Sequence, residues 1–480
     1  MLKKQRQHSS KCCKPSASHL KVSSKLRILH TSDWHIGQYL HSFDRVYEHQ
    51  CFLKWLLNQI KTLEIDALLI AGDIFDTANP SAVSQKLWLE FLANAKTIAP
   101  YLNIVVIAGN HDSPSRLEAP NPLLEKFGIH VVGLVCDAES RQINFEKVCV
   151  PLKNKNGEIK AWCLAVPFMR NNDLPAKETL NLANENSATS NSDLNSENLI
   201  STAANSDLIS ENLISTNANS DQSNNAQALL YQKLFRDILE RKEKNQAIVA
   251  MGHLHISNAQ MSPDSERRIV SGGLDGLPSD IFDSRLSYVA LGHLHLAQRV
   301  GGSENRRYSG SPIPMSFSEI HYKHQVIVFD LNNECVENLQ QIEVPRFVQL
   351  LQIPAGQEKD KSIEHVLKIL QELNLNCDVP EQWPYLMVRV HLNGPDPSLR
   401  AKIENALAGK PVRLTRIEVS TNTTLQPLGD SSQIQTITLD QLNPEEVFSK
   451  LFAARFGNPV PSDLMQAFLQ LNHFYEEPSK

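Results

Sequence analysis

The chain has 480 residues, of which 41% are hydrophobic and 21% are charged, and its formal net charge is −6 at pH 7. This length exceeds what one ordinary hydrophobic core supports and predicts two or three domains. The composition excludes a chain that is disordered throughout. No apolar run approaches the roughly 18–20 residues of a membrane-spanning helix, and the negative charge gives no sign of a nucleic-acid binder.

The first 25 residues carry seven Lys or Arg and no acidic residue. No apolar stretch follows, as a secretory signal requires, so we expect a disordered basic tail over residues 1–25. An organellar transit peptide has a similar composition and stays an alternative. The 8 cysteines have no regular spacing, which favours a reducing, cytoplasmic environment.

One sequence unit recurs over residues 26–343: a short apolar run, a small residue, and then a cluster of Asp, Asn or His. Continuous apolar runs between helical patterns predict strands that are buried on both faces. The alternation indicates an α/β fold, whose ligands bind beyond the carboxyl ends of the strands. The predicted strands are 26–31, 67–70, 104–107, 247–250 and 286–291.

Residues 176–226 interrupt this pattern with a stretch rich in Asn and Ser. It contains two near-identical copies of about fourteen residues, at 192–205 and 206–219. Two copies are too few for a solenoid, which needs about three or more stacked repeats. The composition predicts a disordered surface insertion that the protein does not need.

The C-terminal part has a different layout. Residues 346–425 alternate strand and helix patterns without His clusters, which predicts a small α+β domain. Residues 430–476 predict helices, the first of them starting at Pro444. Its apolar face carries Phe448, Phe452 and Phe456.

Five polar clusters follow the predicted strands. Any one of them is weak, because a lone Gly-His pair after a strand is commonly a capped turn. All five in this order are far beyond chance. The clusters are DWH at 33–35, GDIFD at 72–76, GNHD at 109–112, GHLH at 252–255 and GHLH at 292–295.

Imidazole, carboxylate and amide groups in such numbers fit two transition-metal ions. Magnesium prefers oxygen ligands, so manganese or iron is the better expectation, and we favour two manganese ions per chain. Asp73 follows its glycine at the end of the second strand and has two oxygens with which to bridge the ions. The resulting positive pocket suits a phosphate and lowers the pKa of a bound water.

In this order the clusters resemble the metallophosphoesterase signature set. Longer strings resemble the SbcD family, the nuclease subunits of bacterial SbcC–SbcD complexes. The resemblance is close over residues 26–343 and extends to the C-terminal part by layout only. It implies two mixed sheets flanked by helices in a four-layer sandwich, a small α+β capping domain and C-terminal helices. The strings are LRILHTSDWHIGQ at 26–38, AGDIFDT at 71–77, AGNHDSPSRL at 108–117, YVALGHLHLAQ at 288–298 and YSGSPIPMSFSE at 308–319.

The resemblance also implies individual roles. His111 would face the phosphate as the catalytic residue and protonate the leaving oxygen. The neighbours keep two interpretations each: Asp76 orients a ligand or caps the next helix, and Arg116 contacts substrate or is a solvated charge. His255 is expected to be a bystander. One ion would be held by Asp33, His35, His295 and the bridging Asp73, and the other by Asp73, Asn110, His253 and His293.

Two further features keep alternatives. Candidate phosphate contacts are scattered, and the stretch 308–319 is either a tight turn or a loop that lines the DNA path. The aromatic stripe from Phe448 to Phe468 either binds a partner or covers its own domain, and we favour the partner. The candidate contacts are Arg116, Arg170, Arg299, Arg306 and Arg307.

The implied activity is that of an ATP-stimulated nuclease in DNA repair and recombination, which digests double-stranded DNA as an exonuclease and opens hairpins as a single-strand endonuclease. Its expected partner is an SbcC-type ATPase with a long coiled coil, in a heterotetramer that contains a homodimer of this chain. The alternatives are another metallophosphoesterase, such as a protein phosphatase or a cyclic-nucleotide phosphodiesterase, and a non-catalytic scaffold.

Overall fold

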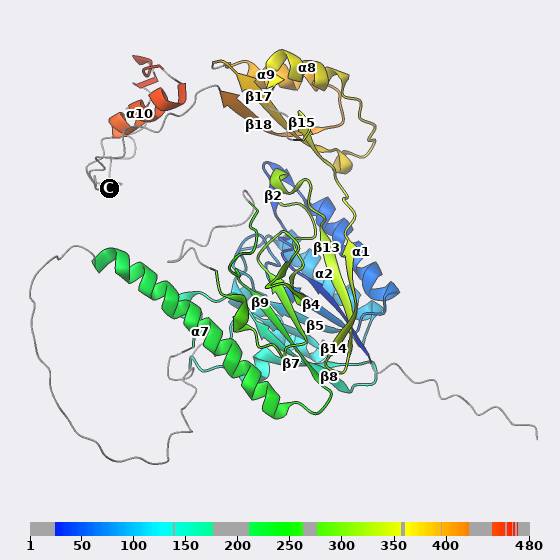
Figure 1. Ribbon diagram of the computed structural model, residues 1–480. Helices are drawn as coiled ribbons and strands as arrows, with labels where there is room; N and C mark the ends of the chain where they lie inside the picture. The colour runs from blue at the N-terminus through cyan, green and yellow to red at the C-terminus, as the bar shows by residue number, and fades with distance from the viewer. Residues whose placement is uncertain are drawn as a thin grey trace, which may run out of the picture. The chain divides into compact units, whose positions relative to one another are not determined.

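The computed structural model describes residues 25–137, 140–175, 211–262, 276–356, 361–394, 396–421 and 444–456, followed by 458–462, 464–465 and 468. The basic tail, residues 176–210 of the insertion and most of the last predicted helix lie outside the described residues. The chain divides into two compact units, Met1–Tyr39 with Asp44–Arg346 and Leu40–Phe43 with Phe347–Lys480 (Figure 1).

The first unit contains two six-stranded mixed sheets. In the first sheet the strand order is β14-β13-β1-β4-β5-β6, and β1, β4, β5 and β6 run parallel. These elements are β1 Leu26–Thr31, β4 Ala67–Ala71, β5 Asn103–Ile107, β6 Ile129–Val132, β13 Gln325–Asn332 and β14 Cys335–Glu343.

In the second sheet the order is β11-β12-β10-β9-β8-β7, and β8, β9, β10 and β12 run parallel. Its strands are β7 Cys149–Lys153, β8 Ile159–Val166, β9 Ala247–His253, β10 Tyr288–Gly292, β11 Gln298–Val300 and β12 Ser303–Tyr308. The five predicted strands are therefore β1, β4, β5, β9 and β10, and the α/β fold with two mixed sheets is confirmed.

One hydrophobic core lies between the two sheets. It contains Leu69 and Val105 from the first sheet and Val249 and Ala290 from the second, all fully buried. Because the parallel strands are covered on both faces, their sequences are continuously apolar instead of alternating.

Helices cover the outer faces of this sandwich. Phe52, Leu56 and Ile60 recur every fourth residue on α1 (Val46–Thr62), which gives that helix one buried face. Helix α2 (Ala82–Ile98) starts at Ser81, whose hydroxyl accepts a hydrogen bond from the amide of Ser84 at 3.1 Å. No described helix is both long and apolar enough to cross a membrane.

Helix α7 (Glu211–Arg241) corrects one expectation. The sequence analysis placed residues 211–226 in a disordered insertion, whereas they form the first part of this helix (green in Figure 1). Its second half is anchored in the core by Leu230, Leu234 and Ile238. The stretch before that anchor contains no Pro or Gly, so nothing stops the helix from extending backwards from it.

The second unit contains a small sheet in which β17 pairs with β15, β16 and β18, always in parallel. Its helices α8 and α9 pack together, and Val366, Leu370, Val388 and Ile403 form the centre of its core. The elements are β15 Leu350–Ile353, β16 Lys361–Ser362, α8 Ile363–Glu372, β17 Tyr385–Leu392, α9 Leu399–Ala406, β18 Arg413–Thr421 and α10 Pro444–Phe456.

Residues 40–43 also belong to this second unit, although the sequence analysis counted them with the first domain. The Phe43 ring lies 6.0 Å from the Tyr385 ring and 5.8 Å from the Arg413 guanidinium. These contacts join segments far apart in the chain, so no local pattern announces them. The remaining short elements are β2 Tyr39–Leu40, β3 Phe43–Asp44, α3 Pro114–Glu118, α4 Asn121–Leu124, α5 Phe145–Val148 and five 3-10 turns, η1 Glu125–Phe127, η2 Asn171–Asp173, η3 Ser279–Ile281, η4 Phe317–Glu319 and η5 Pro380–Gln382.

Candidate metal centre

The five polar clusters lie where β1, β4, β5, β9 and β10 end. Within each sheet these strands are parallel neighbours, so their carboxyl ends meet at one edge, and β4 lies against β9 and β10 of the other sheet. The side chains are drawn together from both sheets as a result. Buried members of the cluster are Asp33, His35, Asp73, His111, His253, His293 and His295, and Asn110 is half-buried.

The backbone at this edge is strained. Asp33, His35 and Asp73 have φ values of 55°, 48° and 50°, and φ is 105° at His293. Left-handed backbone costs about 1–3 kcal/mol at a residue that is not glycine, and it persists where the surroundings enforce it. Here the amide of Asp33 donates to the carbonyl of Gly72 at 3.0 Å, and the amide of His35 donates to that of Asp73 at 3.0 Å.

Two motif glycines allow the segments to approach one another. A Cβ atom at Gly109 would lie 2.0 Å from Asp73 Oδ1, and one at Gly292 would lie 1.8 Å from the carbonyl oxygen of Ala71. The second contact joins the two sheets directly behind the cluster. Any side chain at either position would push the polar groups apart.

One group of donor atoms comes from Asp33, His35 and His295. One atom from each of these residues lies within 4.8 Å of the other two. The Nε2 atoms of His35 and His295 are 3.2 Å apart. Two imidazole nitrogens that face each other at this distance in a buried site present two lone pairs to one point, which suits a cation.

A second group surrounds Asn110. Its side-chain oxygen lies 2.9 Å from His253 Nε2 and 3.0 Å from His293 Nδ1. The Asp73 carboxylate lies between the two groups, with Oδ2 at 3.4 Å from His253 Nε2 and 3.6 Å from His35 Nε2. The structure therefore brings all seven predicted ligands together and places Asp73 where a bridging ligand would be.

Unpaired polar atoms test whether this set fits a metal ion. Among the described residues, His35 Nδ1 and His293 Nε2 are buried without a hydrogen-bond partner. A buried polar atom without a partner costs free energy unless another group satisfies it. Nitrogen and carboxylate donors converging from five strand ends fit divalent transition metals.

Comparisons with known proteins agree with this geometry. The family model described as calcineurin-like phosphoesterase matches residues 26–297, and the model described as type 5 capsule protein repressor C-terminal domain matches residues 346–456. The SbcD protein of the SbcCD nuclease from Rhodobacter capsulatus is 33% identical over 89% of this chain and 94% of its own length.

The chain belongs to the SbcD nuclease family. The SbcD protein of Escherichia coli K12 is 30% identical over 89% of this chain and 93% of its own length. A dimetal phosphatase structure from Danio rerio is similar to 67% of this chain and 97% of its own, with 11% identity and a TM-score of 0.31, which is too low to carry an argument. Membership makes the buried cluster a divalent-metal site.

Two members of this SbcD metal centre form a charge pair. Burial opposes ionisation of Asp73, but the charges of His253 and His35 hold its pKa well below the ordinary range. Burial lowers the pKa of His253, and the Asp73 carboxylate more than reverses this and raises it to about 9. Burial and the charge of His253 lower the pKa of His293, which is therefore neutral.

His111 is held at the edge of the SbcD centre by two bonds. Its amide donates to Asp73 Oδ1 at 2.9 Å, and its Nδ1 lies 2.8 Å from the carbonyl oxygen of Asp76. Since a carbonyl only accepts, Nδ1 carries the proton of this bond. The rings of His111 and His35 meet edge to face, with centroids 4.7 Å apart.

The neighbouring residues are also placed. Asp76 Oδ1 lies 3.4 Å from His35 Nδ1, and α2 is capped by Ser81, so the capping alternative for Asp76 is wrong. The Asp112 carboxylate accepts three backbone bonds, which hold the turn as expected. Arg116 is exposed on α3, outside the buried cluster, and His255 is half-buried beside it.

The candidate phosphate contacts separate into different classes. Arg170 lies at the rim, where its Nη2 donates to the backbone carbonyl of Asn110 at 3.3 Å. Arg306 donates to the carbonyl oxygens of Ser279 and Phe282, and Arg307 is buried, so neither is the free surface cation that sequence analysis expected. Side chains of a strand that lies between others are used internally.

The sequence analysis missed Glu319. Its Oε1 atom lies 2.9 Å from Nδ1 of His295, and the residue is completely buried. The only local signal is one acidic residue in a stretch of Ser, Pro and aromatic residues, which does not reveal that it faces a ligand.

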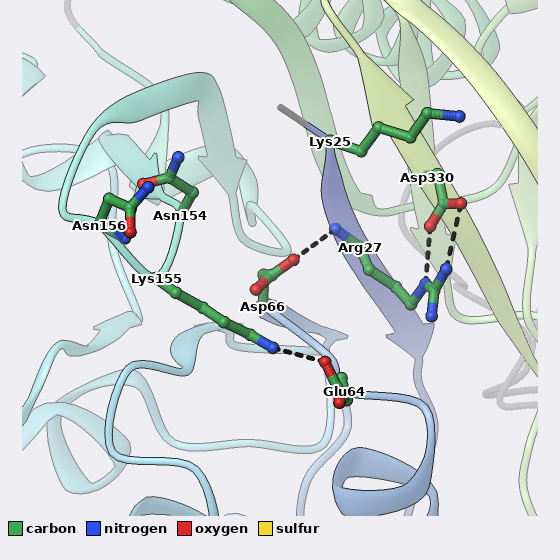
Figure 2. Close-up of a pocket in the computed structure, with 8 residues that line it drawn as sticks. All are labelled: Lys25, Arg27, Glu64, Asp66, Asn154, Lys155, Asn156 and Asp330. Carbon is green, nitrogen blue, oxygen red and sulfur yellow. Dashed lines mark hydrogen bonds and ion pairs between the residues drawn. The ribbon is translucent and has the colours of Figure 1, made fainter. Parts of the chain in front are cut away.

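A separate pocket lies near the amino ends of β1 and β4, away from the cluster. It has a volume of about 300 Å³, and Figure 2 shows its charged side chains. Arg27 pairs with Asp330 at 2.7 Å and Lys155 with Glu64 at 2.8 Å. Its charges already satisfy one another, so this pocket is a surface ion-pair network and gives no site.

Proposed function

We propose that the chain is the nuclease subunit of an ATP-dependent DNA repair and recombination complex. It hydrolyses phosphodiester bonds as a double-strand exonuclease and as a single-strand endonuclease that opens hairpins. The observation that carries this proposal is the convergence of two carboxylates, four imidazoles and one amide in one buried site of an SbcD family member. The six cysteines that the structure describes are free, which suits a reducing cytoplasm.

We propose two manganese ions as the native metals. Asp33, His35 and His295 would hold one ion, and the second would be held by Asn110, His253 and His293. Asp73, between the groups, would bridge them. The nitrogen-rich donor set favours manganese over magnesium. When bound, the ions supply Lewis acidity and an activated water.

His111 is the proposed catalytic residue. Because Nδ1 donates to the Asp76 carbonyl, Nε2 is the atom left to carry a proton to the leaving oxygen of the phosphodiester. The bond from the His111 amide to Asp73 Oδ1 fixes the distance between this imidazole and the bridging carboxylate. With its side chain almost buried, His111 can reach only a phosphate that has entered the cluster.

The test is digestion of an end-labelled linear duplex by metal-stripped chain given back manganese, alone and with the ATPase partner and ATP. Wild type and His255→Gln should digest the duplex. His293→Ala should lose more than the roughly 10–100-fold that outer-shell changes cause, since it removes a ligand. No cleavage under any condition would refute the nuclease proposal, and equal cleavage by His293→Ala would refute the ligand set.

We propose an SbcC-type ATPase with a long coiled coil as the partner of α10, as the names of the relatives imply for them. Phe448 stacks on Phe468 with centroids 4.2 Å apart, so part of the aromatic stripe packs on itself. Leu451 and Phe456 are 64% and 39% exposed and remain for a partner. Leu451→Glu should abolish capture of the ATPase, whereas Val379→Glu, at another exposed apolar residue, should not.

We also propose a homodimer within a heterotetramer. Leu123 and Phe127 are 60% and 55% exposed and lie four residues apart on α4 and η1, a spacing that suits burial against a second copy. Light scattering should give twice the chain mass of 53.9 kDa for wild type and for Val379→Glu. Leu123→Glu should give the mass of one chain, and a dimeric Leu123→Glu would refute this interface.

For the second unit we propose the role of a cap that contacts double- and single-stranded DNA. Its edge strand β18 carries Arg413 and Arg416, and Lys410 precedes it. Phosphate contacts by such cations weaken as salt rises. Arg416→Ala should reduce the slope of DNA affinity against salt concentration, and an unchanged slope would refute the contact.

A further inference from the structure

Glu319 is an acidic residue in the interior of the first unit. It ends the 3-10 turn η4 and is 0% exposed. A buried carboxylate is costly unless hydrogen bonds satisfy it. Its Oε2 atom accepts from the Met315 amide at 2.9 Å and from the Ser311 hydroxyl at 3.4 Å, while Oε1 faces Nδ1 of His295 at 2.9 Å.

The contact with His295 divides the work of the two ring nitrogens. A carboxylate accepts hydrogen bonds, so Nδ1 of His295 must donate to Glu319. The other nitrogen, Nε2, points into the cluster, 3.2 Å from His35 Nε2 and beside Asp33. With its proton on Nδ1, neutral His295 presents a lone pair at Nε2, which is what a metal ligand needs.

The loop that carries Glu319 is fixed from outside the cluster. The carbonyl of Met315 accepts from Gln38 Nε2 at 2.9 Å, and that of Pro314 accepts from Arg45. Arg45 is itself buried and paired with Glu48 at 2.7 Å. Glu319 is therefore held by bonds to its loop, and the loop is held by residues that follow the first polar cluster, so the carboxylate has little freedom to turn away from His295.

We propose that Glu319 is a positioning residue of the metal centre, which holds His295 with Nδ1 protonated and Nε2 directed at the cation. This inference rests on the proposed two-metal function and deepens it, since it gives the stretch 308–319 a task in metal binding that the sequence did not predict. Partners of this kind raise the basicity of a metal-bound histidine, and their loss typically reduces metal affinity about 10–100-fold.

The experiment measures manganese affinity of the metal-stripped full chain by calorimetry. Glu319→Gln should bind manganese about 10–100-fold more weakly than wild type. Glu304→Gln is the matched control, since Glu304 lies on the surface and pairs with Arg299 and Arg307, and it should bind like wild type. In a His295→Ala background, Glu319→Gln should cause no further loss, because the residue acts through that imidazole.

Thermal unfolding of the metal-free variants separates positioning from general stability. A Glu319→Gln protein that melts earlier but binds manganese normally would overturn the proposal, as would an equal loss of affinity in the His295→Ala background. Glu319→Asp, which keeps the charge but shortens its reach to Nδ1, undergoes the same cycle should the Gln variant not fold. Absence of manganese binding by wild type would refute the proposed function instead.

Discussion

Manganese binding should release a proton from His253, so that affinity rises with pH. In the metal-free chain the Asp73 carboxylate, 3.4 Å away, outweighs the effect of burial and raises the pKa of His253 to about 9. Below that pH the imidazole is protonated, and a protonated nitrogen cannot bind a metal ion. His293 is already neutral, because burial and the charge of His253 lower its pKa, so it contributes no proton.

The size of the effect follows from the pKa of about 9. At pH 7 the proton must be removed about two units below that pKa, which costs about 2.7 kcal/mol and weakens binding about 100-fold. Each unit of pH between 6 and 8 should therefore change affinity about tenfold, with weaker binding at lower pH.

The assay is titration calorimetry with manganese at pH 6.5, 7.25 and 8.0, in pairs of buffers that differ in ionisation enthalpy. Wild type and the control His255→Gln should release close to one proton from this site for each metal-loaded chain. His253→Gln should bind more weakly and lose that proton. Affinity that does not change across this range, without proton release, would refute the ion pair between Asp73 and His253.

Three further predictions concern the architecture. Gly292→Ala places a Cβ 1.8 Å from the Ala71 carbonyl oxygen, so urea unfolding should show a loss beyond the about 1–3 kcal/mol of ordinary overpacking; a loss below 1 kcal/mol would contradict the close sheet contact. Leu370→Ala should cost the second unit about 2–5 kcal/mol in the same assay, yet leave manganese affinity unchanged because every proposed ligand lies in the first unit; weaker binding would contradict this separation. Deletion of residues 180–205 should leave metal affinity and duplex digestion at wild-type values, and a loss of either would show that the insertion is needed.

Much of the first unit follows from local sequence. Strands such as 67–71 and 247–253 are covered on both faces, so their residues are continuously apolar and the pattern can be recognised without a structure. The polar residues follow directly after those strands because ligands gather at carboxyl ends. Backbone geometry reinforces the signal, since Gly109 and Gly292 occupy positions where no other side chain fits.

Other features depend on segments that are far apart in the chain. Glu319 meets His295 across 24 positions, and residues 40–43 join the second unit through Phe43 and Tyr385. The burial of Arg307 and the backward extension of α7 likewise depend on what packs beside them. A residue type states what a side chain can do, but not which partner it meets.

The sequence by itself thus determined the strands, the order of the polar clusters and the kinds of donor atom that converge, because each of these is written in residues close together in the chain. Only the tertiary structure decided which nitrogen of His295 faces the cluster, that Asp73 lies between the two donor groups, and that His253 carries a proton in the metal-free chain. These depend on distances of a few ångströms between residues from different strands, and electrostatic and hydrogen-bond energies change steeply over such distances.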